Sequence, residues 1–249
     1  MKKVAIYTCV TGGYDEIKAP HCINPNIDYI CFSDKEISLP FPWKLQILNN
    51  NLLLSHFDLK DLNRAIKINP EKYGYLNGYE LIIYIDGSIE IISDLSDLID
   101  SLMISDHDFF MYEHFMRTCV YDEAMECNLI GHDWYWKIRK QMIEYKRKGF
   151  PKNYGLFECS IICRKPNVAV STFMEKWFEK YMSGVKRDQL SFTYTAWELN
   201  HSIISLGQSD ARFSNNNFRL HSHTIQRSEF KRRCKSKINR ILTNIIGDF

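Results

Sequence analysis

The stretch that decides the fold is YELIIYIDGSIEII, which spans residues 79–92. Residues 81–85 form a run of branched and aromatic side chains, which is typical of a β-strand buried on both faces. The run stops at Asp86-Gly87-Ser88. An acid where such a strand ends lies at the carboxyl edge of the sheet, where open α/β folds bind ligands, and Gly87 allows a close backbone approach. We therefore predict that Asp86 faces a metal ion and a diphosphate. The alternative is an ordinary turn that joins two strands of a hairpin.

The composition is that of a globular chain with free thiols. Its 249 residues are enough for one large α/β domain or two small ones, and 45% hydrophobic with 25% charged residues exclude overall disorder. No apolar run is long enough to span a bilayer, and the start, MKKVAIYTCVTGGYD, is better explained as a first strand than as a signal peptide. The eight cysteines form no CxxC pair, which argues against a zinc ribbon. We expect free thiols in a reducing cytoplasm.

The first part of the chain supplies candidate nucleotide contacts after two predicted strands. Residues 3–10 form the first strand, and residues 27–32 form the second. Asp34, just beyond the second strand, is placed to contact a ribose or a base, or else to start a turn. The glycine-rich segment after the first strand is either a binding loop whose backbone N–H groups meet phosphate or base, or a plain tight turn. The candidate contacts in that turn are Thr11, Gly12, Gly13 and Tyr14.

Two basic residues lie near the end of a predicted helix. Residues 58–68 have helical spacing, and Arg64 and Lys67 fall in the last turns, close to the expected sheet edge. Basic residues at this position complement the helix C-terminus, or they reach a phosphate of a bound nucleotide. Both interpretations stay open on the sequence alone.

Two later strands bring a histidine and an acid to the same region. Residues 108–112 form a buried strand that is followed by His114, which repeats the strand-end position of Asp86, although a single histidine is more often structural. Residues 156–164 form another strand, from which Glu158 points to one face. An acid inside a strand pattern indicates a lined cleft, or an ion pair with a nearby arginine.

The segment before a late helix is a second candidate region. Asp188 precedes a helix predicted to run towards residue 204, so it is either an N-cap or, with Gln189, part of the cleft, where it binds or deprotonates a substrate hydroxyl. Farther on, His221 and His223 are two residues apart in an extended segment, so both point to one face. This spacing suits a metal site.

The C-terminal segment is basic and amphipathic. Residues 227–240 carry seven basic residues and one acid, so the rest of the chain is net negative. Ile238, Ile241, Leu242 and Ile245 share one helical face. Such a helix suits an anionic membrane surface. The alternative is a helix that packs on its own domain, and we expect no nucleic-acid partner because no recognition motif accompanies the charge.

The order of motifs points to a family. TGGYD, DYICFSD, YIDGSIEI, EHFMR, QMIEYKRKGFP, LFECSIICR and RDQLSF follow one another over roughly residues 4–224. This order resembles the family once listed as DUF616, the glycosyltransferase-like domain of the TOD1/MUCI70 type. The resemblance implies an α/β fold, a GT-A-like Rossmann-type domain with a mixed central sheet flanked by helices. We assign this domain to residues 1–225 and a basic amphipathic C-terminal tail to residues 226–249.

The resemblance also implies roles for the candidate residues. Asp86 stands where the aspartate of the family's metal-binding motif stands, with Ser88 in the place of its second acid, and His221 or His223 is the further ligand of Mn²⁺ or Mg²⁺. Arg64, Lys67 and Arg187 are a second means of balancing the charge of the leaving diphosphate. The expected catalytic residues are Asp188, Asp86 and Glu158. The expected donor contacts are Thr11, Gly12, Gly13, Tyr14, Asp34, Arg64, Lys67, Asp86, Gly87, Ser88, His114, Arg187 and Gln189.

Taken together, the sequence predicts a glycosyltransferase of the hexosyltransferase type. It would move a sugar from a nucleotide-diphosphate sugar to a cell-surface polysaccharide or lipid-linked glycan, assisted by a divalent metal at Asp86. We expect it to work at the cytoplasmic face of a membrane, held there by its tail. One alternative is a metal-dependent hydrolase that gathers Asp86, His114, His221 and His223 around one ion. The other is a non-catalytic protein that binds a nucleotide sugar.

Overall fold

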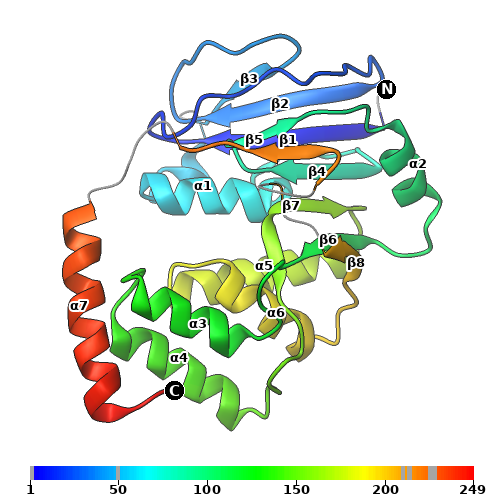
Figure 1. Cartoon of the computed structure of the whole chain (residues 1–249). Coiled ribbons are helices and arrows are strands. Elements are labelled where there is room, and N and C mark those ends of the chain that lie inside the picture. The colour runs from blue at the N-terminus through cyan, green and yellow to red at the C-terminus, as the bar shows by residue number, and fades with distance from the viewer. Residues whose placement is uncertain (1–2, 49–50, 209–210, 212–214, 224–228) are drawn as a thin grey trace.

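A seven-stranded mixed sheet forms the centre of the computed structural model, which describes residues 3–48, 51–208, 211, 215–223 and 229–249 (Figure 1). The strand order is β3-β2-β1-β4-β7-β6-β8, and β7 runs antiparallel to both of its neighbours, whereas the other neighbouring pairs are parallel. The strands are β1 (Val4–Val10), β2 (Ile27–Ser33), β3 (Lys44–Ile47), β4 (Leu81–Ile85), β6 (Phe109–Glu113), β7 (Phe157–Arg164) and β8 (Ile204–Gln208). A mixed central sheet flanked by helices is the predicted fold class.

The decisive strand lies where the sequence predicts it. β4 spans Leu81–Ile85 and is buried at every position, between β1 and β7. The apolar run after Asp86-Gly87-Ser88 does not pair with β4. It forms β5 (Ile89–Ile91), which pairs with β9 (Phe218–Leu220) in a separate two-stranded sheet. The hairpin alternative is therefore wrong, because the partner of β5 comes from the end of the domain.

Helices cover both faces of the sheet and form one further layer. α1 (Leu59–Ile68), α5 (Val168–Ser183) and α6 (Gln189–Glu198) pack on one face, and α2 (Ser96–Ile104) packs on the other. α6 ends at Glu198 rather than near residue 204, because Asn200 adopts a left-handed φ of 49° and β8 follows. Two short 3₁₀ turns, Leu52–Leu54 and Pro70–Tyr73, complete this part of the chain.

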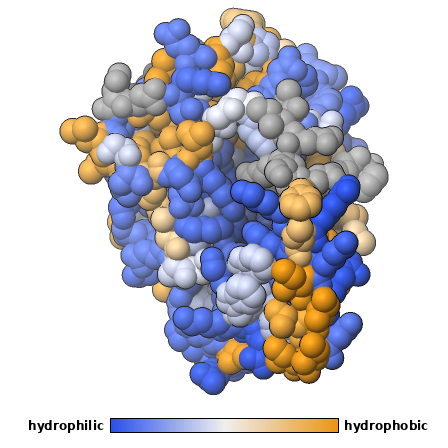
Figure 2. All heavy atoms as spheres, turned by 90° about the vertical axis from the view of Figure 1, so that its left-hand side faces the viewer, coloured by the Kyte–Doolittle hydropathy of each residue, from blue (hydrophilic) through white to orange (hydrophobic). Residues whose placement is uncertain are grey.

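Three helices stand apart from the sheet and share a core with one side of α6. α3 (Val120–Leu129), α4 (Tyr135–Arg147) and α7 (Glu229–Ile246) lie together in Figure 1, and α7 stands at one side of the molecule. Figure 2 shows a column of hydrophobic side chains at the lower right of this face and a further hydrophobic group at the upper left, with hydrophilic side chains between them. No helix in the described ranges combines the length and the apolarity that crossing a membrane requires. The assigned boundary near residue 225 stays a prediction, and residues 226–228 lie outside the described ranges.

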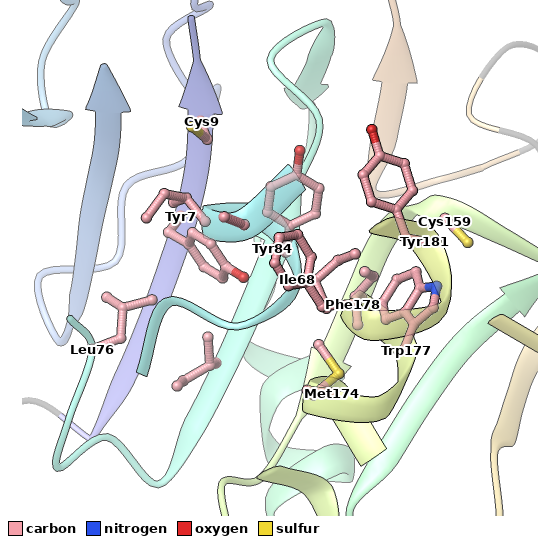
Figure 3. Packing of buried hydrophobic residues seen from close by; sticks show 14 of the residues in the cluster. Tyr7, Cys9, Ile68, Leu76, Tyr84, Cys159, Met174, Trp177, Phe178 and Tyr181 are labelled. Atoms are coloured by element: carbon pink, nitrogen blue, oxygen red, sulfur yellow. The ribbon is translucent and has the colours of Figure 1, made fainter. Parts of the chain in front are cut away.

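Successive side chains along each strand point to opposite faces of the sheet, which divides the main core into two layers. Tyr7 and Tyr84 point to the α1, α5 and α6 side and belong to the same core cluster as Trp177, while Ile83 points to the α2 side. Figure 3 shows Tyr7, Tyr84 and Trp177 packed in the first layer, with the Tyr84 hydroxyl directed towards the carboxyl end of the strands. The core therefore places a polar group at the edge where Asp86 lies. All eight cysteines are free thiols, as expected.

Candidate active site

A pocket of about 300 Å³ opens at the carboxyl end of β4. This volume is at the lower end of the range for small-molecule sites. Its walls come from the end of α1, the Asp86-Gly87-Ser88 turn, β7, the start of α6 and the segment after β9. The predicted site residues that line it are Arg64, Lys67, Asp86, Ser88, Glu158, Arg187, Asp188, Gln189, His221 and His223. The pocket thus brings together candidate residues that are far apart in the sequence.

Asp86 lies at the end of β4 and is partly open to the pocket. Its backbone N–H donates to the carbonyl of Ser160 on β7, over 2.8 Å, which continues the sheet by one residue. Its Oδ1 accepts the Tyr84 hydroxyl at 2.7 Å and the Lys67 ammonium at 3.2 Å. Burial, with the nearby Asp86 carboxylate, raises the pKa of Tyr84 well above its ordinary value, so Tyr84 remains a hydrogen-bond donor. Two donors therefore fix the direction of the Asp86 carboxylate.

Gly87 lets this turn approach the loop that follows β1. A Cβ at Gly87 would lie 2.8 Å from Cγ2 of Val10 and 3.1 Å from Cβ of Asp15. Real Cβ contacts are not so short, so any other residue would push the turn away from the loop. The predicted need for a close backbone approach is met here, and the contact is with protein.

Lys67 is the most buried charge of the pocket, with a side chain only 1% exposed. Its ammonium lies 2.8 Å from Oδ2 of Asp188 and 3.2 Å from Oδ1 of Asp86, and it also faces the Tyr84 ring. Arg64 adds a second contact to Asp188, at 3.2 Å from Nε. A buried charge is tolerated when it is paired and hydrogen-bonded, so this network joins α1, β4 and α6.

The pKa of Asp188 bears on its predicted role as a base. Burial alone would raise this pKa, but Arg64, Lys67 and Arg187 outweigh it and hold the pKa of Asp188 well below its ordinary value. An efficient general base has a pKa near the working pH. Asp188 also accepts the Gln189 backbone N–H, as an N-cap of α6. The geometry favours Asp188 as a fixed negative charge that orients cations over Asp188 as a proton acceptor.

A second ionic chain supports Arg187 from behind. Arg187 Nη2 donates to Oε1 of Glu123 at 3.2 Å, and Arg117 Nε donates to the other Glu123 oxygen at 2.8 Å. Glu123 is 2% exposed and lies on α3. The sequence pattern did not single out Glu123, because an acid on an amphipathic helix normally belongs to its solvated face. No acceptor among the described residues lies within hydrogen-bonding reach of Arg187 Nε, which is buried.

Glu158 projects from β7 into the pocket beside His114 and Gln189. Gln189 Nε2 donates to Glu158 Oε2 at 3.3 Å. His114 lies behind the pocket wall, where its Nδ1 accepts the backbone N–H groups of Met116 and Arg117. This leaves the ring proton on Nε2, which lies 3.4 Å from Glu158 Oε1. Glu158 thus has a histidine among its ionic partners, and it still lines the cleft.

The late histidines reach the pocket through the two-stranded sheet. The His221 backbone N–H donates to the Ser88 carbonyl at 2.8 Å, which places the segment after β9 against the Asp86 turn. Each imidazole has a carboxylate partner of its own. His221 Nε2 lies 2.8 Å from Glu90, and His223 Nδ1 lies 2.7 Å from Asp15. Glu90 and Asp15 were not expected at the site, since each lies in a segment that the sequence explains without them.

The predicted metal ligands line one pocket without forming one coordination sphere. Asp86 is engaged by Lys67 and Tyr84, and both histidines face other acids. In the part of the chain that the structure describes, no three His, Cys, Asp or Glu side chains are arranged to hold a metal ion. The ligand set Asp86, Ser88, His221 and His223 does not fit such a site here. The convergence that the hydrolase alternative requires is not seen either, because His114 lies against Glu158.

The glycine-rich turn after β1 is held by protein contacts beside the pocket. The Gly12 N–H donates to Oδ1 of Asp34 at 2.7 Å, and the Thr11 hydroxyl donates to the Leu59 carbonyl. Gly12 and Gly13 have φ values of 67° and 68°, which favour glycine. Tyr14 packs against the His223 ring, 4.6 Å between centroids. These predicted nucleotide contacts therefore border the pocket rather than line it.

The chain is similar to two solved glycosyltransferase structures at low sequence identity. No curated protein matches the sequence. Among solved structures, mouse xyloside xylosyltransferase 1 in its apo form is 11% identical, with 81% of this chain and 84% of that chain covered and a TM-score of 0.49. The apo WbbM bifunctional glycosyltransferase is 10% identical, with 82% and 39% covered and a TM-score of 0.47.

The family comparison covers more than half of the chain. Residues 77–222 match the model of the TOD1/MUCI70 glycosyltransferase-like domain, from just before β4 to the segment after β9. The match includes Asp86, Glu158, Asp188 and His221, all of which line the pocket. With the strand order, it confirms the predicted GT-A-like fold class. The chain belongs to the TOD1/MUCI70 family of glycosyltransferase-like domains.

Proposed function

We propose that this protein transfers a sugar from a nucleotide-diphosphate donor to a hydroxyl of a glycan. One observation carries the proposal: Arg64, Lys67 and Arg187 meet Asp86 and Asp188 in a pocket at the carboxyl end of β4. That edge is where open α/β folds bind ligands. The family's glycosyltransferase-like domain supports the reaction class.

In this proposal the cationic side chains stabilise the leaving diphosphate. As the bond between the anomeric carbon and the phosphate oxygen breaks, negative charge grows on the diphosphate. Arg187 has a buried Nε without an acceptor among the described residues, so a phosphate oxygen can complete its hydrogen bonds. Asp188 and Glu123 hold Arg64, Lys67 and Arg187 in place before the donor arrives. Such preorganisation lowers the barrier without rearrangement at the moment of reaction.

Glu158 is the better candidate for the proton acceptor. A new bond forms from the acceptor hydroxyl oxygen to the anomeric carbon, and the hydroxyl proton must go to a base. Glu158 lines the pocket and is partly exposed, with His114 Nε2–H and Gln189 Nε2–H directed at its two oxygens. The depressed pKa of Asp188 makes that carboxylate a weaker acceptor. We assign Asp86 to the hydroxyls of the donor sugar, since it is the open acid at the strand end.

In this proposal the side chains alone balance the charge of the diphosphate, because the described residues do not form a ligand set for a divalent ion. Metal assistance through Asp86 stays a prediction. The proposed acceptor is a cell-surface polysaccharide or a lipid-linked glycan at the cytoplasmic face of a membrane.

The test is a comparison of wild type with Asp86→Ala. A panel of nucleotide sugars is assayed for donor hydrolysis and for transfer, and thermal unfolding is measured alongside. We expect Asp86→Ala to lose about 10²–10³-fold in rate with its fold retained, as for other losses of a preorganised polar group. Asp100→Ala, on the exposed side of α2, is the matched control. Full activity of Asp86→Ala would overturn the assignment, and titration heat without turnover in wild type would favour the binding-protein alternative.

A further inference from the structure

Helix α7 packs on the protein through its polar residues. Asn239 is fully buried: its Oδ1 accepts the Tyr135 backbone N–H, and its Nδ2 donates to the carbonyls of Asn128 and Asp133. Ser236 donates to the Leu129 carbonyl. A helix that packs on its own domain normally does so with its apolar face. Here the side of α7 that faces α3 and α4 makes its contacts mainly through hydrogen-bonding side chains.

The contact is close and specific. A Cβ at Gly131 would lie 2.2 Å from the Arg232 carbonyl oxygen and 2.7 Å from the Ser236 nitrogen, so the backbone of α7 rests directly on the turn between α3 and α4. Gly131 also has a φ of 71°. Leu242 reaches the apolar core of this layer, and Phe249 is buried there beyond the helix end. The packing alternative is therefore confirmed, and it involves the opposite side of the helix from the isoleucines.

The isoleucines of α7 point to solvent. Ile238, Ile241 and Ile245 are 42%, 58% and 75% exposed, and Phe230 continues the same stripe towards the start of the helix. Figure 2 shows the hydrophobic column on this side of the molecule, with hydrophilic side chains on its flanks. Scattered exposed apolar residues need no explanation, but a continuous stripe marks an interaction surface.

The apolar surface continues into a groove between α7 and α4. The groove has a volume of about 540 Å³. Ile246 and Leu242 of α7 form one side, and Trp136 and Ile143 of α4 form the other. The Trp136 ring is 52% exposed and stacks on Trp134. Tryptophan is typical of the boundary between water and lipid. Basic residues rim the groove, namely Arg139, Lys140 and Arg147.

The same two helices carry an excess of positive over negative charge. α7 carries six basic residues against one acid, and α4 carries five against one. The whole chain is net positive by only two, so everything outside α4 and α7 is net negative by seven. The positive charge of this face attracts an anionic partner, and the net negative charge of the rest of the chain repels it.

We propose that the docking face, formed by the exposed side of α7 and the groove with α4, binds the surface of an anionic phospholipid membrane. The apolar stripe would enter the boundary between headgroups and acyl chains, and the flanking lysines and arginines would meet lipid phosphates. The positive charge of the docking face favours a membrane over a second copy of this chain, because two such basic faces repel each other. The proposal does not depend on the enzymatic one. If both hold, a lipid-linked acceptor meets the pocket at the membrane, because α7 begins soon after the pocket-lining His223.

The test is the partitioning of the full chain onto vesicles. Wild type is centrifuged with phosphatidylcholine vesicles that contain or lack phosphatidylglycerol, at low and high ionic strength. We expect the triple variant Ile238→Ser, Ile241→Ser, Ile245→Ser to lose about 100-fold in partitioning, since three apolar side chains no longer enter the bilayer. We expect Lys231→Gln, Lys237→Gln and Arg240→Gln together to lose about 100-fold on anionic vesicles only.

Matched controls separate this face from general stickiness. Leu52→Ser, Ile104→Ser and Val168→Ser remove apolar side chains that are just as exposed elsewhere, and we expect no change in partitioning. Transfer to a soluble acceptor should be unchanged in the isoleucine variant. Wild-type binding that ignores phosphatidylglycerol, or an isoleucine variant that binds like wild type, would overturn the proposal. A dimer in light scattering that the isoleucine variant abolishes, without vesicle binding, would assign the face to a second copy.

Discussion

The pocket at the end of β4 and the docking face on α7 depart from ordinary burial in opposite directions. In the pocket, Lys67 and Asp188 are removed from water and each positive side chain meets a negative one. On α7, isoleucines are exposed and the positive charges outnumber the acids. Buried charge and exposed apolar surface both cost stability, so each marks a place where folding alone does not explain the residues.

This difference in burial and charge indicates which kind of partner each region binds. A balanced, rigid set of charges holds its geometry in the absence of a ligand, which is what stabilisation of a reacting group requires. An unbalanced charge beside apolar side chains has its partner outside the molecule, and the partner must be both anionic and apolar. Substitutions in each region, and chelation at the pocket, separate the two kinds of partner.

The largest effect is expected for Asp188→Asn. Removal of this carboxylate leaves Lys67 and Arg64 without their main buried partner, and such a loss costs about 3–5 kcal/mol in the free energy of unfolding. Denaturant unfolding measures it. Glu175→Gln is the control, because its ion pair with Lys72 is exposed and should change stability by less than about 1 kcal/mol. Equal, small losses in both variants would mean that the pocket network contributes no more than a surface pair.

The pH dependence of that effect follows from the depressed pKa of Asp188. A carboxyl whose pKa is lowered in the folded state contributes fully above its unfolded pKa of about 4, and the contribution is lost as pH falls through the folded pKa. The stability difference between wild type and Asp188→Asn should therefore be constant from neutral pH down to about pH 5 and shrink only below about pH 4. A difference that fades near neutral pH would contradict the ionic assignment.

A smaller effect is expected for Asn239→Ala on the other region. The variant removes the hydrogen bonds of Asn239 to the Tyr135 N–H and to two carbonyls, at a cost of about 1–3 kcal/mol, and loosens α7 from α3 and α4. Hydrogen exchange of α7 amides should speed up while the central sheet stays protected. Asn244→Ala, on the exposed side of the same helix, should leave exchange unchanged. If both variants exchange alike, Asn239 does not anchor the helix.

The smallest effect is expected for chelation. With Arg64, Lys67 and Arg187 balancing the diphosphate, the transfer rate should be the same with EDTA as with Mn²⁺ or Mg²⁺. A rate that disappears in EDTA and returns with Mn²⁺ would instead assign the charge balance to an ion, as the sequence resemblance implies.

Local sequence patterns were sufficient to predict the central strand and the helix end that lines the pocket. A continuous apolar run predicts β4, and the rule that ligands meet strand ends places Asp86 at the pocket. Glu158 was a candidate as an acid inside a strand pattern, and Asp188 as a polar residue at the start of a helix. Helical spacing likewise predicts α1, whose last turns deliver Arg64 and Lys67. These inferences succeed because each depends on residues close in sequence or on the shared edge of one sheet.

Other features depend on contacts that no local pattern records. The pairing of β5 with β9 joins segments 127 residues apart, so the sequence could not exclude a hairpin. Glu123 resembles a solvated helix residue until Arg187 and Arg117 meet it. The periodicity of α7 shows that it has an apolar stripe, but not that the stripe faces outward. That choice is made by Asn239 and Gly131, whose roles appear only in the packed structure.

The small β5–β9 sheet has a consequence for synthesis of the chain. During translation the Asp86 turn emerges early, whereas residues 218–223, which close the opposite side of its cavity, leave the ribosome more than a hundred residues later. A nascent polypeptide therefore has no complete substrate chamber until almost the whole fold has been delivered. Premature termination before that last strand would yield a sheet with its acid in place and a cavity without the wall that His221 and His223 supply.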